Sequence, residues 1–240
     1  MIELAIVGYG KMGKMIESLA SAEKFHISGI YDVINPPETH LKEKADVAIE
    51  FSAPSEVLKN IEFLASKGIN VVCGTTGWYD KTSEVEAIIN TYNTGFIYAS
   101  NFSVGVNLFF SMVKDAARIM NKFAEYGVTV TETHHTQKLD KPSGTGIRTA
   151  EYLIENLENK KSYVSDSEKA AADEINIISH RIENVVGVHE VKFDSEADSI
   201  TLTHSAKSRR GFAEGALLAA EFIHTKKGFY KFEDVFGKIK

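Results

Sequence analysis

The chain has 240 residues, of which 43% are hydrophobic and 25% are charged, and its formal net charge is -6. These values are typical of globular proteins and exclude disordered and collagen-like chains. The negative charge argues against nucleic acid as a main partner. We find neither a signal-peptide pattern nor an apolar run of the ~20 residues that a membrane span needs. The single cysteine, Cys73, fits a reducing compartment. We therefore expect a cytoplasmic protein with one large or two modest domains.

The first hundred residues alternate short apolar runs with longer amphipathic ones. The expected strands are Glu3–Val7, His26–Tyr31, Val47–Phe51, Val71–Cys73 and Phe96–Ala99. The expected helices between them are Lys14–Ala22, Ser55–Lys67 and Ser83–Tyr92. Alternation of strands and helices predicts a parallel sheet with helices on both faces.

The pattern changes after this region. A long apolar helix, a strand and a second helix are expected at Val104–Phe123, Val128–Thr133 and Gly144–Leu157. A polar stretch, Asn159–Asp173, separates them from three β-like runs, Glu174–His180, Val185–Phe193 and Ser199–His204. A helix at Phe212–His224 and an aromatic tail at Phe232–Phe236 close the chain.

We predict an α/β protein of two domains from this order of elements. The first is a Rossmann-type domain with a doubly wound parallel sheet, over residues 1–102, which the C-terminal segment 211–240 joins. The second is a smaller α+β domain with a mixed open sheet, over residues 103–210, for substrate binding and oligomerisation.

A glycine-rich loop, Gly8-Tyr9-Gly10-Lys11-Met12-Gly13, follows the first expected strand and opens a helix. This is the context in which G-x-G-x-x-G holds the pyrophosphate of a dinucleotide at a helix N-terminus. Asp32 ends the second expected strand, where a carboxylate accepts hydrogen bonds from the adenosine ribose. Asp32 would repel a 2′-phosphate, so we expect NADH to be the better donor.

Two further loops follow the fourth and fifth strands, where such a sheet exposes its carboxyl edge. They are Gly74-Thr75-Thr76-Gly77 and Ser100-Asn101-Phe102-Ser103. Small residues there allow a nicotinamide ring to approach the backbone. Ordinary Gly/Thr and Asn/Ser turns are the alternative interpretation.

A polar segment from Glu132 to Gly146 contains His134, His135 and Lys138, followed by Ser-Gly-Thr at the start of a helix. Three interpretations compete: a metal site, a solvated surface loop, and an acid and anion site. Adjacent histidines on an extended strand point in different directions, and no further cluster completes a metal cage. We therefore predict no metal site. The imidazole and the lysine can hold and donate protons, and a helix N-terminus can hold a carboxylate.

At this point the chain strongly resembles the 4-hydroxy-tetrahydrodipicolinate reductase family. The matching segments, in chain order, are GYGKMG (Gly8–Gly13), FSAP (Phe51–Pro54), CGTTGW (Cys73–Trp78), SNFSVGVN (Ser100–Asn107), ETHHTQKLDKPSGTG (Glu132–Gly146), VGVHEV (Val186–Val191) and HSAKSRRGFAEGAL (His204–Leu217). The chain is short for the family, with a compressed connection from Val33 to Lys44, and it departs from the family's sequence in two further places. It lacks the family's usual glycines between Arg181 and Val185, and Val188 replaces a usual polar residue.

The resemblance implies a cytoplasmic homotetramer that reduces a small dicarboxylate with NADH or NADPH, in the diaminopimelate route of lysine biosynthesis. It implies that His134 and Lys138 are the catalytic proton carriers. The residues implied to bind cofactor are Gly8, Tyr9, Gly10, Lys11, Met12, Gly13, Asp32, Gly74, Thr75, Thr76, Ala99, Ser100, Asn101 and Phe102. Those implied to contact substrate are His135, Gly144 and Thr145. The alternatives are another two-domain reductase, such as an aspartate dehydrogenase, and a non-catalytic nicotinamide sensor.

Overall fold

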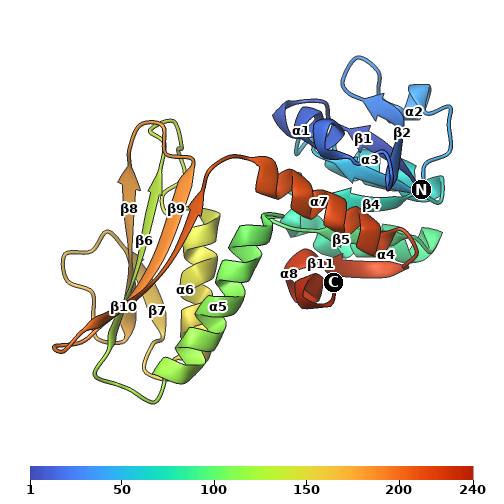
Figure 1. Cartoon of the computed structure of the whole chain (residues 1–240). Helices are drawn as coiled ribbons and strands as arrows, with labels where there is room; N and C mark the ends of the chain where they lie inside the picture. The colour runs from blue at the N-terminus through green and yellow to red at the C-terminus, as the bar shows by residue number, and fades with distance from the viewer. Residues whose placement is uncertain (240) are drawn as a thin grey trace. The chain divides into compact units, whose positions relative to one another are not determined.

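Short strands, fully buried at the centre of the sheet, build the first of two units in the computed structural model, which describes residues 1–239 (Figure 1). This unit comprises Met1–Val104 and the segment from Arg209 onward. Its strands are β1 (Ile2–Val7), β2 (Phe25–Tyr31), β3 (Val47–Glu50), β4 (Asn70–Cys73), β5 (Gly95–Tyr98) and β11 (Gly228–Lys231). They pair in the order β11-β5-β4-β3-β1-β2, and each pair is parallel. Strands that are buried on both faces are rich in apolar residues, as in β3, β4 and β5, where Glu50 and Asn70 are buried polar exceptions.

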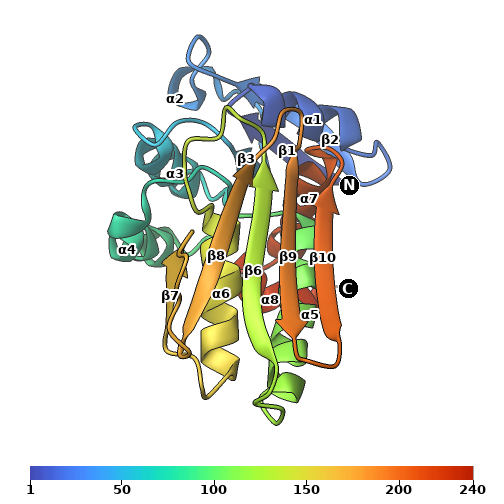
Figure 2. The ribbon, with the colours of Figure 1, turned by 90° about the vertical axis from the view of Figure 1, so that its left-hand side faces the viewer.

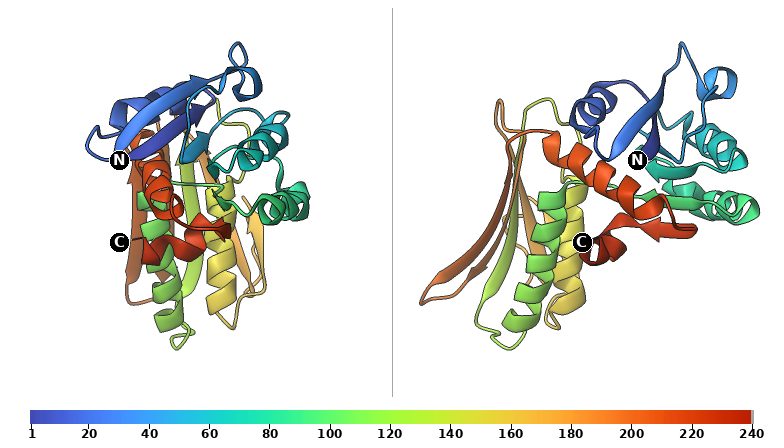
Figure 3. Two further views of the ribbon diagram at one scale, coloured as in Figure 1. Left: turned by 90° about the vertical axis from the view of Figure 1, so that its right-hand side faces the viewer. Right: turned by 45° about the vertical axis from the view of Figure 1, so that its right-hand side comes forward.

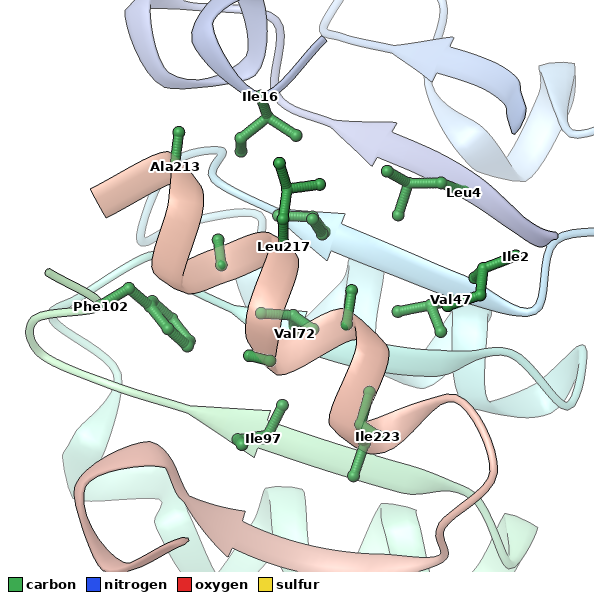
Figure 4. Packing of buried hydrophobic residues seen from close by; sticks show 14 of the residues in the cluster. Ile2, Leu4, Ile16, Val47, Val72, Ile97, Phe102, Ala213, Leu217 and Ile223 are labelled. Atoms are coloured by element: carbon green, nitrogen blue, oxygen red, sulfur yellow. The ribbon is translucent and has the colours of Figure 1, made fainter. Parts of the chain in front are cut away.

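Helices cover both faces of this sheet. They are α1 (Lys11–Leu19), α2 (Pro37–His40), α3 (Val57–Ser66), α4 (Thr82–Tyr92), α7 (Arg210–Ile223) and α8 (Phe232–Val235), with short 3-10 turns η1 (Tyr79–Lys81) and η2 (Phe236–Lys238). One buried cluster joins α1 and α7 to the sheet, and another joins α3 and α4 to it. Figure 4 shows how α7 lies along the sheet, with Leu217 and Ile223 close to Val72 and Ile97. Helix α7 is therefore part of the core of the first unit.

The second unit, Gly105–Ser208, contains a mixed sheet. Its strands are β6 (Gly127–His134), β7 (Ser162–Ser165), β8 (Glu174–Arg181), β9 (Gly187–Asp194) and β10 (Ser199–Ala206), in the order β10-β9-β6-β8-β7. The β6–β8 and β7–β8 pairs are parallel, whereas β9 is antiparallel to both β6 and β10. Helices α5 (Val104–Met120) and α6 (Gly144–Asn156) pack together on one face of this sheet (Figure 3). No described helix of this unit covers the other face, which is turned toward the viewer in Figure 2.

The structure confirms the predicted fold class, with a doubly wound parallel sheet in one unit and a mixed open sheet in the other. Some boundaries were wrong. Helix α1 begins at Lys11 rather than Lys14, because Gly10 is its N-cap and the glycine loop enters the helix directly. Strand β9 begins at Gly187 rather than Val185. A turn precedes it, in which Asn184 has a φ of 65° and supplies the left-handed residue that a glycine would otherwise provide.

Strands β7 and β11, the short helices α2 and α8, and the 3-10 turns η1 and η2 were not predicted. Strand β7 lies within the polar stretch 159–173 and is an exposed edge strand, so it lacks the apolar alternation that identifies a half-buried strand. Strand β11 pairs only with β5, and helix α2 is a single turn that begins at Pro37. Among residues 1–239, no helix has both the length and the apolar character needed to cross a membrane.

Candidate functional site

The glycine loop of the first unit connects the carboxyl end of β1 to α1. Gly8 has a φ of +93°, and a Cβ atom there would lie 2.1 Å from the carbonyl oxygen of Phe51. Only glycine therefore fits this position. A Cβ atom on Gly10, the N-cap of α1, would meet no atom within 4 Å, so the loop is open to a ligand at that point. An open helix N-terminus of this kind suits a pyrophosphate.

A pocket of about 690 Å³ lies beside this loop, within the size range of small-molecule sites. Gly8, Tyr9 and Gly10 line it, together with Asp32 at the end of β2 and residues after β3. Since β2 and β3 lie on opposite sides of β1, the pocket is at the switch point of the sheet, where dinucleotides bind in such folds.

Asp32 uses one carboxylate oxygen to hold its own turn. Its Oδ1 accepts hydrogen bonds from the backbone N–H groups of Ile34 (2.9 Å) and Asn35 (3.0 Å). Its Oδ2 makes no hydrogen bond to any residue of the described chain. Oδ2 is therefore the oxygen that suits a ribose hydroxyl, while Oδ1 keeps the turn in shape.

An ion pair lines the same pocket and was not predicted from the sequence. The Nζ atom of Lys59 lies 3.1 Å from Oε1 of Glu38. Lys59 and Glu38 therefore add one positive and one negative charge to the lining beside Asp32. Glu38 lies on α2, an element that was itself missed, so no pattern in the chain marked it.

A second pocket in this unit brings together two of the predicted cofactor loops. Gly10–Met12 and Gly74–Thr76 line it, and Arg209 lines it as well. Phe51, Ser52 and Pro54, from the FSAP segment, complete the lining. Arg209 was not predicted, because it lies far along the sequence and reaches this loop only through the docking of α7. Its guanidinium supplies a positive charge beside the pyrophosphate loop.

A buried carboxylate, Glu50, organises these loops. It accepts hydrogen bonds from the N–H (3.1 Å) and hydroxyl groups of Ser52 and from the amide of Asn60 (3.3 Å). The N–H of Ser52 also donates to the hydroxyl of Thr75 at 2.9 Å. Glu50 thus connects the loop after β3 with the loop after β4.

The remaining predicted cofactor residues, Ala99–Phe102, follow β5. Phe102 is buried, and its ring contacts Phe51 and Phe232 at centroid distances of 6.2 and 4.9 Å. The Oδ1 atom of Asn101 accepts a hydrogen bond from the N–H of Ser103. The side chain of Phe102 therefore packs in the core. A nicotinamide ring bound here would contact the backbone of this loop rather than the Phe102 ring.

In the second unit, β6 carries the predicted proton carrier His134 at its carboxyl end. Alternate residues of β6, Val128, Val130, Glu132 and His134, are all buried. A charged residue in an otherwise apolar inward face is a signal that could have identified Glu132 from the sequence.

The imidazole of His134 is 8% exposed, and its Nδ1 lies 3.9 Å from Oε1 of Glu132. Its ring packs edge-on against that of His189, with centroids 4.9 Å apart. Burial lowers the pKa of His134 below its usual value; Glu132 opposes this shift, and Lys138 and Arg181 add to it. His134 is therefore a neutral imidazole at pH 7, which can accept a proton.

Lys138 lies in the turn after β6, where its N–H donates to the carbonyl of His135 at 3.1 Å. Its Nζ lies 2.8 Å from Oδ2 of Asp140. Although burial opposes it, the hydrogen bond and charge of Lys138 hold the pKa of Asp140 below its usual value. His135 is partly buried, and its Nδ1 has no hydrogen-bond partner among the described residues.

The helix α6 begins directly after this turn. Ser143 is its N-cap, and the Ser143 hydroxyl accepts a hydrogen bond from the N–H of Gly146 at 3.1 Å. Gly144 is exposed, and a Cβ atom there would meet no atom within 4 Å. The predicted substrate residues Gly144 and Thr145 thus form the first turn of a capped helix, whose positive end favours anions.

Glu132, His134 and His189 also have the composition of a metal site, with candidate ligand atoms within 4.8 Å of one another. The Glu132 carboxylate, however, already accepts hydrogen bonds from the N–H and hydroxyl of Ser143 and from the hydroxyl of Ser179. Nη1 of Arg181 lies 3.6 Å from it, so a guanidinium occupies the cation's place. The donor set therefore does not suit a metal ion.

Comparisons with known proteins match both units of the chain to the same family. Residues 2–102 match the family model described as dihydrodipicolinate reductase, N-terminus, and residues 105–236 match that described as dihydrodipicolinate reductase, C-terminus. The 4-hydroxy-tetrahydrodipicolinate reductase of Christiangramia forsetii is 41% identical over 240 residues and covers 99% of each chain. The enzyme of that name from Methanosarcina barkeri is 32% identical, covering 99% of this chain and all of its own.

Solved structures share the fold. A dipicolinate-bound dihydrodipicolinate reductase from Paenisporosarcina sp. TG-14 superposes with a TM-score of 0.77 and covers 98% of this chain and 99% of its own. Its sequence identity is 23%. An amine dehydrogenase from Mycobacterium smegmatis, 8% identical, covers 97% and 95% with a TM-score of 0.62.

Proposed function

The chain belongs to the dihydrodipicolinate reductase family, and we propose that the residues assembled in its two units carry out this family's reaction. The protein is an NAD(P)H-dependent oxidoreductase that reduces 4-hydroxy-tetrahydrodipicolinate, in lysine biosynthesis. The family match over both units favours this activity over the two alternatives, an aspartate dehydrogenase and a non-catalytic nicotinamide sensor. The observation that carries the residue assignment is the continuous segment from the end of β6 to the start of α6. It holds a neutral imidazole, an ammonium group and a capped helix N-terminus.

The first unit holds the cofactor. The pyrophosphate binds over Gly8–Gly13 at the N-terminus of α1, with Arg209 nearby to balance its charge. The adenosine ribose binds Oδ2 of Asp32. The charge of Asp32 disfavours a 2′-phosphate, so NADH is the preferred donor. The bound nicotinamide supplies the hydride.

The second unit holds the ring substrate, a dicarboxylate. One carboxylate lies at the first turn of α6, at Gly144 and Thr145, and His135 contacts the substrate. Loss of the 4-hydroxyl group as water leaves a conjugated imine, and hydride adds at its electrophilic carbon. Lys138 donates the proton that neutralises the charge developing on the ring, and His134 accepts and returns a proton in the same site.

We also propose a cytoplasmic homotetramer that forms through the second sheet. Support comes from the face of that sheet that no described helix covers (Figure 2). By the alternation of burial along the strands, this face carries the polar residues Thr129, Thr131 and Glu190 and the apolar residues Val188 and Ile178. A face of this size without a helix layer suits burial against another copy. Light scattering coupled to gel filtration tests this assembly: a mass of one chain, 26.5 kDa, would contradict it.

Genetic complementation tests the function. Expression of the chain in a bacterial strain that lacks its own reductase should restore growth without added diaminopimelate. The His134→Ala, Lys138→Ala double variant, produced at the same level, should not restore it. Failure of the wild-type chain to restore growth, despite soluble expression, would contradict the proposed reaction.

A further inference from the structure

The Glu132 side chain is completely buried and lies on β6, two residues before His134. We propose that Glu132 is a positioning residue that holds the substrate turn and the Lys138 segment together and controls the protonation of His134. This inference rests on the proposed roles of His134 and Lys138. Three sets of contacts carry it.

The first set connects Glu132 to the start of α6. The N–H of Ser143 donates to both carboxylate oxygens, at 3.0 and 3.1 Å, and the Ser143 hydroxyl donates to Oε2. A Cβ atom on Gly146 would lie 2.5 Å from Oε2, so the first turn of α6 approaches the carboxylate as closely as a glycine allows. The carboxylate therefore fixes both the cap and the position of the turn proposed to bind substrate.

The second set connects Glu132 to the Lys138 segment through Arg181. Nη1 of Arg181 lies 3.6 Å from Oε1 of Glu132, and this side chain is 17% exposed. Its Nε and Nη2 donate to the carbonyl oxygens of Lys138 (3.2 Å) and Asp140 (2.5 Å). A planar guanidinium with several fixed donors can make these contacts at once. The backbone that carries Lys138 is thus tied to the same buried charge as Ser143.

The third contact is with His134 itself, whose Nδ1 lies 3.9 Å from Oε1. The charged groups that act on His134 are Glu132, Lys138, Arg181 and Asp140, and the ring of His189 packs against it. The two cations and burial favour the neutral imidazole, whereas the two carboxylates favour the protonated form. Because Glu132 is buried, its effect is screened less by water than that of the exposed Asp140.

Glu132→Gln removes the negative charge of this side chain and keeps its shape. The amide oxygen can still accept from the Ser143 N–H, and the amide N–H group can donate to a Ser179 hydroxyl that turns to accept it. We expect a folded protein in which misplacement of the site lowers kcat/KM for the dicarboxylate substrate by about 100-fold. The dissociation constant for NADH should be unchanged. The pKa of His134 should fall further, so the acidic limb of the kcat/KM profile should move to lower pH.

Two comparison variants sharpen this test. Glu155→Gln removes the same charge from an exposed position on α6, where Glu155 faces Arg148 at 3.7 Å, and should behave as wild type. Glu50→Gln removes an equally buried carboxylate from the first unit and should weaken NADH binding without changing dicarboxylate binding.

Two measurements remain informative even without turnover. The first is binding of pyridine-2,6-dicarboxylate, measured by calorimetry; Glu132→Gln should weaken it. The second is titration of His134 by NMR, assigned by the signal lost in His134→Asn; it should show the downward pKa shift. The wild-type protein could bind the dianion but fail to reduce the substrate, while Glu132→Gln still lowers the pKa of His134. In that case the proposed function fails and the positioning role stands. Unchanged dianion binding and an unchanged His134 titration in Glu132→Gln would overturn the positioning role, as would equal losses for NADH and dianion.

Discussion

The ammonium group of Lys138 lies 2.8 Å from the carboxylate of Asp140, and 56% of the Asp140 side chain is exposed. An exposed ion pair of this kind contributes little to stability. The charge of Lys138 also acts on His134, whose pKa it helps to lower. A dianionic substrate can replace Asp140 as the partner of Lys138 without breaking the fold. This pair therefore suits the proposed role of Lys138, in which its ammonium group leaves Asp140 when the substrate binds.

The first prediction concerns Lys138→Ala. Removal of the proton donor should lower kcat by about 100-fold to 10,000-fold, because general acid catalysis supplies a factor of this order. The dissociation constant for NADH, followed by fluorescence titration, should stay nearly the same, because Lys138 belongs to the second unit. Lys141→Ala is the matched control, since Lys141 lies in the same loop but pairs with Asp166 at 2.9 Å. Near-normal turnover in Lys138→Ala would show that another group donates the proton.

The second prediction concerns cofactor preference. Asp32→Ala should raise KM for NADH by about tenfold to 100-fold, the value of one or two hydrogen bonds to a charged group, and raise KM for NADPH much less. Because Oδ1 of Asp32 also holds the turn at Ile34 and Asn35, Asp32→Asn is the necessary control. It keeps an acceptor for the turn and removes only the charge. An equal loss for NADH and NADPH in Asp32→Ala, with none in Asp32→Asn, would mean that the residue serves the turn alone.

The third prediction concerns Arg209, which lines the pocket beside the glycine loop. Arg209→Gln should raise the dissociation constants for NADH and NADPH about tenfold and to a similar extent, because both carry the same pyrophosphate. The effect should shrink as salt is added. Arg210→Gln changes the adjacent arginine, which pairs with Glu214 at 2.7 Å, and should leave both constants unchanged. Similar effects of the two substitutions would point to general surface charge rather than to contact by Arg209.

The fourth prediction concerns the stability of the protein in acid. Burial, followed by the charges of His134 and His204, lowers the pKa of His189 to about 3. Above the unfolded pKa of about 6.5, His189 is neutral in both states and its contribution is fully present. Below that value the unfolded chain takes up a proton that the folded chain does not, so stability falls until the pH reaches about 3.

Between pH 7 and pH 5, His189 should account for a loss of about 2 kcal/mol in the free energy of unfolding. Urea unfolding at both pH values measures this loss. His189→Gln should reduce the difference between the two pH values by that amount, whatever its effect on stability at pH 7. The same pH dependence in both proteins would mean that His189 does not titrate as its burial requires.

Much of the fold was predictable because its signals are local. The glycine loop, the buried strands of the first sheet and the capped start of α6 each depend on a few adjacent residues. Strands β7 and β11 were missed because their positions depend on pairing with distant strands rather than on their own sequences. The same applies to Arg209, which the docking of α7 brings to the cofactor loop.

The site was predictable only in part, for a similar reason. His134, Lys138 and the first turn of α6 are close together in the sequence, at the end of β6 and in the turn that leads to α6, so they could be predicted as one group. The partners of Glu132 come from two separate segments, with Ser143 at the start of α6 and with Ser179 and Arg181 on β8. No spacing along the chain reveals that they converge. The inward position of Glu132 on an apolar strand face was the one available sign.

Turnover by the purified protein tests the central claim most directly. The product of condensing aspartate semialdehyde with pyruvate would be supplied by a coupling enzyme, and loss of reduced nicotinamide absorbance followed with NADH and then with NADPH. We predict oxidation of the nicotinamide that depends on the condensation product and is faster with NADH at low cofactor concentration. Absence of oxidation with either cofactor, by a protein that is folded and binds NADH, would contradict the assignment.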